Sequence, residues 1–400
     1  MPGISSESLY EKTTVALIQA MKHGSIDAIS RVPRLLSLLS TSPSARGAFS
    51  AAFGRGDIPV WIFVPWVSQM VGSLDLAEGE AIAPVLVELA KEYPQAVFYP
   101  LNVSSRKAQA QARRLSAPIW TILDSSCPIL RTFVKACELS VHPEHRAKDA
   151  ITEIKALKQE GKTPEIELRR ALQELASDCF DDTNPSLGRY NLEKAREWRV
   201  QLRKEKMTFS DDVLPPLSWV DRIAQIVATD RKPERPTTLQ AYSHWMATYH
   251  AMNNDGGSSY LEVPGQYSKL GVMPAPERHS MITSFEGNVL VMSSLRCPKR
   301  IGIVTNDSGI KYFLLKGGED LRLDERIEQV FTLTNGFLAN SGKSKRGLEI
   351  STYSVVPLSY RSGIIEWVQG TETFKSLVTK QLIKMVCIAF TNDKHVINYL

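Results

Sequence analysis

One lysine and two acidic residues in the stretch "LLKGGEDLRLDERIEQVF" (314–331) have the types and spacing of a phosphate-binding site. A β-rich run ends at Lys316, two glycines interrupt it, and an acidic helix carrying Asp324 follows, with Glu319 as a nearer acidic residue. Phosphoryl transfer depends on positioning and charge neutralisation, so a nucleotide site needs a lysine on the phosphates and an acidic residue that holds this lysine. A single Lys/Asp pair is a weak signal, because an ordinary surface ion pair has the same spacing. The pattern therefore indicates either a phosphate-binding lysine or a surface ion pair.

Short β-rich runs on both sides of this stretch predict a small sheet. The turn sequence "NDSG" joins two of the runs as a hairpin, and a helix is expected from about residue 321 to residue 338. The runs are "NVLVMSSL" (288–295), "KRIGIVT" (299–305), "IKYFLLK" (310–316), "LEISTYSVVPL" (348–358) and "SGIIEWV" (362–368). Five strands with one inserted helix is the element order of a protein-kinase N-lobe.

The chain before these strands has a helical apolar period, which predicts an array of helices with short loops. Ser25 is placed to cap one helix, and the almost entirely apolar run "VWIFVPWVSQMV" (60–71) predicts a buried helix kinked at Pro65. Turn-forming residues cluster at 181–190 and at 253–259 and mark two boundaries. The predicted fold class is thus α + (α+β), a helical array followed by a β-rich, kinase-like N-lobe, without a C-lobe.

Composition fits an intracellular globular protein. The net charge is +5, 43% of the residues are hydrophobic and the mean hydropathy is −0.16. The five cysteines are scattered without a CxxC pair, so we expect neither a disulfide scaffold nor a zinc ribbon. The N-terminus lacks a signal-peptide pattern, and no run of about 18 apolar residues predicts a membrane span.

Three blocks closely resemble the catalytic domain of the phosphatidylinositol 3-kinase-related protein kinases, and their order and spacing fit that family's N-lobe. The blocks are "VMSSLRCPKRI" (291–301), "FLLKGGEDLRLDERIEQVF" (313–331) and "TYSVVPLSYRSGIIEWV" (352–368). "LEVPGQY" (261–267) resembles the block that opens the domain. Within the family, the similarity points to the branch that acts in DNA double-strand-break repair. Three segments resemble the FAT-type helical region of that branch: "YPQAVFYPLNVSS" (93–105), "PSLGRY" (185–190) and "VWIFVPWVSQMVGSLD" (60–75).

This resemblance implies four parts and covers about residues 25–380. Residues 1–185 would be a FAT-like helical array, and residues 186–258 an insert like the FRB domain, which lies over the substrate entrance. Residues 259–380 would be the kinase N-lobe, part of a PI3/PI4-kinase-like catalytic domain, and residues 381–400 a divergent tail.

The resemblance also implies roles for individual residues in ATP binding. Lys316 would bind the phosphates, with Asp324 as its helix partner and Glu319 as the alternative. Tyr353 and Ile365 would line the inner adenine pocket, while Trp367 would stack on the base and Val368 would offer it backbone hydrogen bonds. The phosphate-covering loop would consist of Val289, Leu290, Val291, Met292, Ser293, Ser294 and Leu295. The alternative for the hinge residues is plain strand core.

Two departures from the family pattern matter. Leu323 stands where the family has glutamine, which changes the helix surface without touching Lys316 or Asp324. More importantly, the 400 residues contain no catalytic-loop "DRHxxN" and no "DFG", so the sequence supplies no catalytic aspartate and no metal ligands. The family transfers the γ-phosphoryl group of ATP to protein serine and threonine with Mg²⁺, but we expect this chain alone not to do so. Whether it is an enzyme stays open, and a non-catalytic helical scaffold is the competing interpretation.

Partners and location are implied by the resemblance only. It implies a nuclear protein that acts in non-homologous end joining with the Ku heterodimer and DNA ends. We do not expect these residues to bind DNA directly, because the N-terminal arrays that contact DNA and Ku are not among them. Two other motifs carry no prediction: "GFLANSGKS" (336–344) lacks a glycine that a P-loop requires, and "HPEH" (142–145) lacks further metal ligands.

Overall fold

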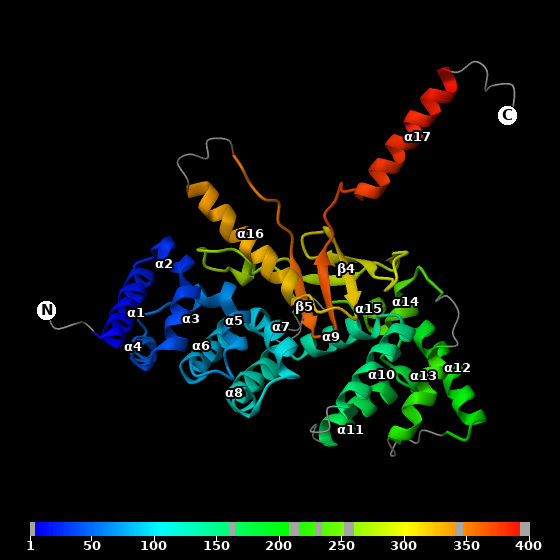
Figure 1. Ribbon diagram of the computed structural model, residues 1–400, viewed down its shortest axis with the longest axis horizontal. Coiled ribbons are helices and arrows are strands. Elements are labelled where there is room, and N and C mark those ends of the chain that lie inside the picture. The colour runs from blue at the N-terminus through cyan, green and yellow to red at the C-terminus, as the bar shows by residue number, and fades with distance from the viewer. Residues whose placement is uncertain are drawn as a thin grey trace. The chain divides into compact units, whose positions relative to one another are not determined.

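A computed structural model describes residues 5–159, 165–207, 216–228, 234–251, 260–340 and 347–392. The chain forms two compact units, residues 1–366 and residues 367–400. In the first unit, helices make up the first half of the sequence and strands follow near its end (Figure 1). The predicted fold class, a helical array followed by an antiparallel β-rich lobe, is confirmed.

The N-terminal array is a series of short helices that pack through their apolar faces. Their bounds are α1 (Ser6–Lys22), α2 (Ile26–Ser30), α3 (Val32–Thr41), α4 (Pro43–Gly54), η1 (Val60–Trp66), α5 (Val67–Gly72), α6 (Gly79–Glu92), α7 (Pro94–Ser105), α8 (Ala110–Ser126) and α9 (Ile129–Leu139). The Ser25 hydroxyl accepts a hydrogen bond from the Ala28 amide at 3.3 Å and so caps α2. The helix expected after Ser25 is therefore two helices, which meet at Arg31.

The apolar run at residues 60–71 is buried and interrupted, as predicted. Pro65 lies inside the 3₁₀-helix η1, and α5 begins two residues later. Proline has no amide hydrogen to donate to the preceding turn, which disfavours a regular α-helix at this position. Ile62, Phe63 and Val64 are buried.

The array and the sheet share one hydrophobic core. Phe133 of α9 stacks on Phe285 of the first strand with ring centroids 6.3 Å apart, and Trp245 of the short helix α15 (His244–Thr248) lies 6.3 Å from Phe285. Buried residues of α3 to α9 and of the strands belong to the same cluster. The array is thus a support onto which one face of the sheet is packed.

A second core joins four further helices and surrounds Trp198 and Phe180, whose rings are 5.6 Å apart. The helices are α10 (Pro143–Gln159), α11 (Glu165–Leu175), α12 (Arg189–Lys204) and α13 (Val220–Ala228), with η2 (Ala176–Phe180) and η3 (Leu217–Trp219) between them. Its buried residues run from Ala147 to Val227 and so come from both sides of the boundary expected at residue 185. That domain boundary stays a prediction.

The sheet is antiparallel, with the strand order β1-β3-β4-β6-β5 and with β2 paired to β3. The strands are β1 (Ile282–Phe285), β2 (Leu290–Val291), β3 (Lys299–Thr305), β4 (Ile310–Gly317), β5 (Val355–Ser359) and β6 (Ser362–Glu366). "NDSG" makes the predicted turn between β3 and β4, and Ser308 adopts a positive φ of 62° there. All five predicted strands are present, and β1 is an additional strand at the edge.

The two faces of the sheet differ in their environment. Pairing of Lys299 with Leu315 and of Leu315 with Ile364 places these three side chains on one face, where they are at most 3% exposed. Pairing of Lys316 with Gly363 places Lys316 on the opposite face. That opposite face is only partly covered, and Leu290 at its edge is 47% exposed.

Helix α16 (Arg322–Asn340) follows β4 and lies beside β5 (Figure 1), in the predicted position between β4 and β5. Two short helices, α14 (Leu239–Tyr242) and η4 (Pro276–Arg278), complete the first unit. The second unit contains α17 (Phe374–Asn392). Within the described ranges, no helix is both long and apolar enough to cross a membrane. The P-loop-like sequence at 336–344 runs into residues 341–346, which lie outside the described residues, as do residues 393–400 of the expected tail.

Candidate functional site

The strand register brings the β2–β3 turn and Lys316 to the same end of the sheet. Val291 pairs with Lys299, the first residue of β3, and Lys299 pairs with Leu315 of β4. Lys316 is the next residue along β4, so it lies at the end of the sheet where the turn begins. A phosphate-covering loop requires this relation to its lysine.

The segment predicted to cover phosphates forms strand β2 and the first part of this turn. The Met292 amide donates to the Pro298 carbonyl at 2.9 Å, and the Cys297 amide donates to the Ser294 carbonyl at 3.1 Å. Ser293, Ser294 and Leu295 are exposed, whereas Val289 is buried. The two serines are therefore available to a ligand, and Val289 anchors the start of the segment in the core.

Lys316 forms an ion pair with Glu319, with 2.5 Å between Nζ and Oε2. The side chains of Lys316 and Glu319 are 24% and 39% exposed. No ion pair joins Lys316 to Asp324, although both residues are described. Of the two acidic partners considered from the sequence, the structure thus pairs the lysine with the nearer one.

Tyr353 lies close to both Asp324 and Lys316. Its backbone amide donates to Glu328 Oε2 at 3.2 Å. Burial raises the pKa of the Tyr353 phenol, the carboxylates of Glu328 and Asp324 raise it further, and the charge of Lys316 lowers it. The structure therefore gathers Lys316, Asp324 and Tyr353 into one electrostatic neighbourhood.

Ile365 lies on the same face of the sheet as Lys316. It pairs with Leu314 of β4 and with Val355 of β5, and it is half-buried. Trp367 and Val368 directly follow β6 in sequence and belong to the second unit, where Val368 is 44% exposed. Their roles at the adenine base stay predictions.

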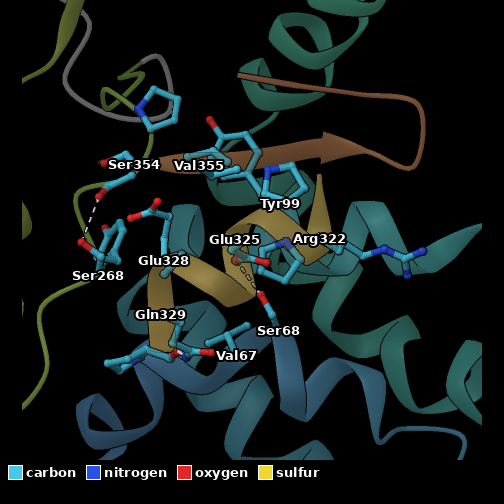
Figure 2. Close-up of a pocket in the computed structure, with 18 of the residues that line it drawn as sticks. Val67, Ser68, Tyr99, Ser268, Arg322, Glu325, Glu328, Gln329, Ser354 and Val355 are labelled. Atoms are coloured by element: carbon cyan, nitrogen blue, oxygen red, sulfur yellow. Dashed lines mark hydrogen bonds between the residues drawn. The ribbon is translucent and has the colours of Figure 1, made fainter. Parts of the chain in front are cut away.

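A large cavity of about 820 Å³ lies beside this site, between α16, β5 and the helical array (Figure 2). Tyr353 and Val355 line it, but Lys316 does not. The Ser68 hydroxyl of α5 donates to Glu325 at 3.1 Å, and burial raises the pKa of that carboxyl group. Gln69 and Gln329 join the same two helices, with 2.6 Å between the amide nitrogen of Gln69 and Gln329 Oε1.

Sequence reasoning did not identify this cavity. The signal for it is the polar series Glu325, Glu328, Gln329 and Thr332 on α16, whose spacing places these residues on one helix face. Leu323, which departs from the family pattern, also lines the cavity and is 69% exposed.

A second lysine, Lys299, was not singled out from the sequence and lies on the buried face of the sheet. It is 3% exposed, its Nζ is 2.8 Å from His142 Nδ1 and 4.3 Å from the ring centre of Tyr242. Burial lowers the pKa of Lys299 to about 7, and burial together with Lys299 lowers the pKa of His142 to about 3. Both histidines of "HPEH" are thus placed by packing, and the described residues hold no group of three metal-ligating side chains.

Comparison with known proteins finds similarity along nearly the whole chain. The family described as "Phosphatidylinositol 3- and 4-kinase" matches residues 311–398, beyond residue 380, where we expected the similarity to end. The DNA-dependent protein kinase catalytic subunit of Dictyostelium discoideum is 37% identical over 383 residues, 92% of this chain, and that of Canis lupus familiaris is 30% identical over 393 residues, 94% of this chain. The serine/threonine-protein kinase TOR of Oryza sativa subsp. japonica is 27% identical over 367 residues, 88% of this chain and 14% of its own length. The chain spans about 9% of the length of the two DNA-dependent relatives.

Proposed function

Because the chain belongs to the phosphatidylinositol 3-kinase-related protein kinases, we propose that its sheet and α16 form the ATP-covering half of a serine/threonine kinase site. The observation that carries this proposal is the position of Lys316. It lies at the sheet end that carries the serine-bearing turn, it forms an ion pair with Glu319, and its side chain is 24% exposed.

In this site, Lys316 would neutralise the phosphate oxygens of ATP, and Ser293 and Ser294 would donate hydrogen bonds to them. Tyr353 and Ile365 would contact the adenine from the inner side. Trp367 would stack on the base, and the Val368 backbone would fix its edge. The role of these groups is positioning and charge neutralisation, which are the main contributions of a protein to phosphoryl transfer.

The residues that would complete the reaction are not among these 400. The sequence holds neither "DRHxxN" nor "DFG", the motifs that supply the catalytic aspartate and the metal ligands in this family. We therefore propose that this chain binds ATP weakly and does not transfer its γ-phosphoryl group. Magnesium would enter the reaction through ligands supplied by a catalytic-loop lobe.

The names of the relatives support a wider role. The relatives from Dictyostelium discoideum and Canis lupus familiaris bear the name DNA-dependent protein kinase catalytic subunit, so we propose that the chain is part of such a kinase. It would then act in the nucleus, in end joining of DNA double-strand breaks, together with the Ku heterodimer and DNA ends. We do not propose that these residues contact DNA themselves.

A non-catalytic helical scaffold is the competing function. It is favoured by apolar side chains that the lobe leaves uncovered, since Leu295 is 87%, Leu323 69% and Phe337 66% exposed. A scaffold would use this surface for a protein partner and would have no need of a nucleotide.

Calorimetric titration of the purified chain with ATP separates the two functions. We expect weak binding that persists when EDTA replaces Mg²⁺, and weaker binding of adenosine, because adenosine lacks the phosphates that Lys316 would contact. Absence of ATP binding would favour the scaffold. Equal affinity for ATP and adenosine would show that Lys316 does not hold phosphates.

A further inference from the structure

Helix α10 approaches the candidate site from the helical side of the molecule. Its residues Ala147, Ile151 and Ile154 are buried in the second core. Asp149 and Glu153 are four residues apart and so project from one side of the helix. Both carboxylates contact the β-rich lobe.

Asp149 forms an ion pair with Arg296, which belongs to the phosphate-covering β2–β3 turn. Arg296 Nη1 lies 2.9 Å from Oδ1 and 3.0 Å from Oδ2 of Asp149. The side chain of Arg296 is 34% exposed and that of Asp149 is 22% exposed. Arg296 directly follows Leu295, so the pair holds the turn beside its exposed serines.

The same ion pair lies against the end of the strand that carries Lys316. Gly318 has a φ of 72°, and a Cβ atom added to it would lie 2.6 Å from Asp149 Oδ2 and 2.7 Å from Arg296 Nη1. Only glycine accommodates both this backbone conformation and this close approach. The Gly318 amide also donates to the Arg361 carbonyl at 2.6 Å, and the Arg361 side chain pairs with Glu153 of α10.

We propose that Asp149 is a positioning residue that fixes the phosphate-covering turn relative to Lys316. The proposal rests on the proposed function, because it concerns the same ATP site. Asp149 contacts no nucleotide-binding group itself and acts through Arg296. Without this carboxylate, the turn would keep its strand pairing but lose its tie to α10, which lies beside the end of the lysine strand.

A purely structural ion pair would behave differently. Partly exposed ion pairs contribute little to stability, so removal of one changes the free energy of unfolding little. Removal of a positioning pair, by contrast, changes the local order of the turn and the affinity of the chain for phosphates. Local order and global stability can be measured separately.

The matched control is the ion pair of Asp182 and Arg199, whose side chains are 26% and 18% exposed. Arg199 lies on α12, and Asp182 also forms a longer ion pair of 3.9 Å with Arg196 of the same helix. Asp182→Asn therefore removes a comparable pair away from the candidate site.

The test compares Asp149→Asn, Arg296→Gln and Gly318→Ala with Asp182→Asn in the full chain. Amide hydrogen exchange of residues 292–298 should accelerate about fivefold or more in the first three variants and remain unchanged in the control. The Kd for ATP should rise about three- to tenfold, and Asp149→Glu should restore most of both properties. The urea midpoint of Asp149→Asn and of Arg296→Gln should change no more than that of the control, whereas Gly318→Ala should also lose stability because alanine is strained at this positive φ.

Unchanged exchange of the turn in Asp149→Asn would overturn the proposal, as would faster exchange with an unaltered Kd for ATP. Equal effects in Asp182→Asn would also overturn it, because they would reveal a general loosening. If the unmodified chain binds no ATP, the proposed function fails. The exchange measurement still decides whether Asp149 orders the turn.

Discussion

Lys299 and Lys316 lie on neighbouring strands of one sheet but on opposite faces, and their surroundings differ completely. Lys299 is 3% exposed, contacts His142 and the ring of Tyr242, and has no carboxylate within ion-pair distance in the described chain. Lys316 is partly exposed and paired with Glu319. Burial disfavours the charge of Lys299, whereas the side chain of Lys316 is accessible to solvent and has a carboxylate beside it.

The strand register produces this difference. Lys299 pairs with Leu315, so the residue after Leu315 points to the other face. One face is packed on the helical array, and the other carries the candidate site. The residue type alone therefore does not determine function; the face on which a lysine lies does.

The largest expected effect is a loss of stability when one of two neighbouring leucines on β4 is replaced by alanine. Leu315→Ala removes a side chain that is 2% exposed and should lower the free energy of unfolding by about 3 to 4 kcal/mol. Leu314→Ala, on the half-buried face, should cost about 1 kcal/mol. Urea unfolding of both variants measures the contrast, and equal losses would contradict the assignment of the two faces.

The second effect concerns the pH dependence of stability. The pKa of Lys299 falls to about 7 on folding, from about 10.4 in an unfolded chain. Between these values the unfolded state binds the proton and the folded state does not, so stability should rise with pH. Lys299→Met should reduce this rise by about 3 kcal/mol between pH 7 and pH 10, measured by urea unfolding at several pH values.

The neighbour His142 does not change this sign, because its pKa of about 3 keeps it neutral throughout the range. A Lys299→Met variant whose stability rises with pH as steeply as that of the unmodified chain would show that Lys299 is charged in the folded state at all these pH values.

The third effect is on nucleotide affinity. Lys316→Met should weaken ATP binding about 30-fold, or about 2 kcal/mol, because a charge-assisted contact to phosphate is lost. Lys299→Met serves as the control on the opposite face and should leave the Kd for ATP unchanged. Calorimetry measures the Kd for ATP of both variants. A larger rise of this Kd in Lys299→Met than in Lys316→Met would contradict the assignment of the ATP site to the face of Lys316.

The smallest expected effect is a change in the Kd for ATP that distinguishes the roles of Glu319 and Asp324 beside Lys316. Glu319→Gln should change the Kd for ATP by less than about threefold, because the pair is partly exposed and screened. If Asp324 takes over the lysine when ATP binds, Asp324→Asn should have a greater effect than Glu319→Gln. The reverse order in the same titration would mean that the contact with Glu319 is retained in the complex.

Local sequence patterns predicted the elements that local forces determine. The turn "NDSG", the break at Pro65 and the helix that became α16 all follow from residue preferences within a few positions. Strand β1 was missed because "ITSF" is too short to show alternation, and its pairing with β3 depends on residues about twenty positions away.

Long-range contacts could not be read from spacing. Nothing in "KRIGIVT" indicates that Lys299 points inward onto His142, and the contact between Ser68 and Glu325 joins residues more than 250 positions apart. The choice between Glu319 and Asp324 was open for the same reason, because both spacings allow an ion pair. The sequence thus predicted the candidate site, and the packing shows which side chains lie beside its residues.

The central claim, that Lys316 contacts the phosphates of ATP, is tested most directly with an acyl phosphate of ATP. A lysine amine beside the bound phosphates attacks the acyl carbonyl, forms an amide and releases ATP. Mass spectrometry of the digested chain should find the label on Lys316, suppressed by excess ATP, and not on Lys299. Labelling that excess ATP does not reduce, or that falls on other lysines, would contradict the account.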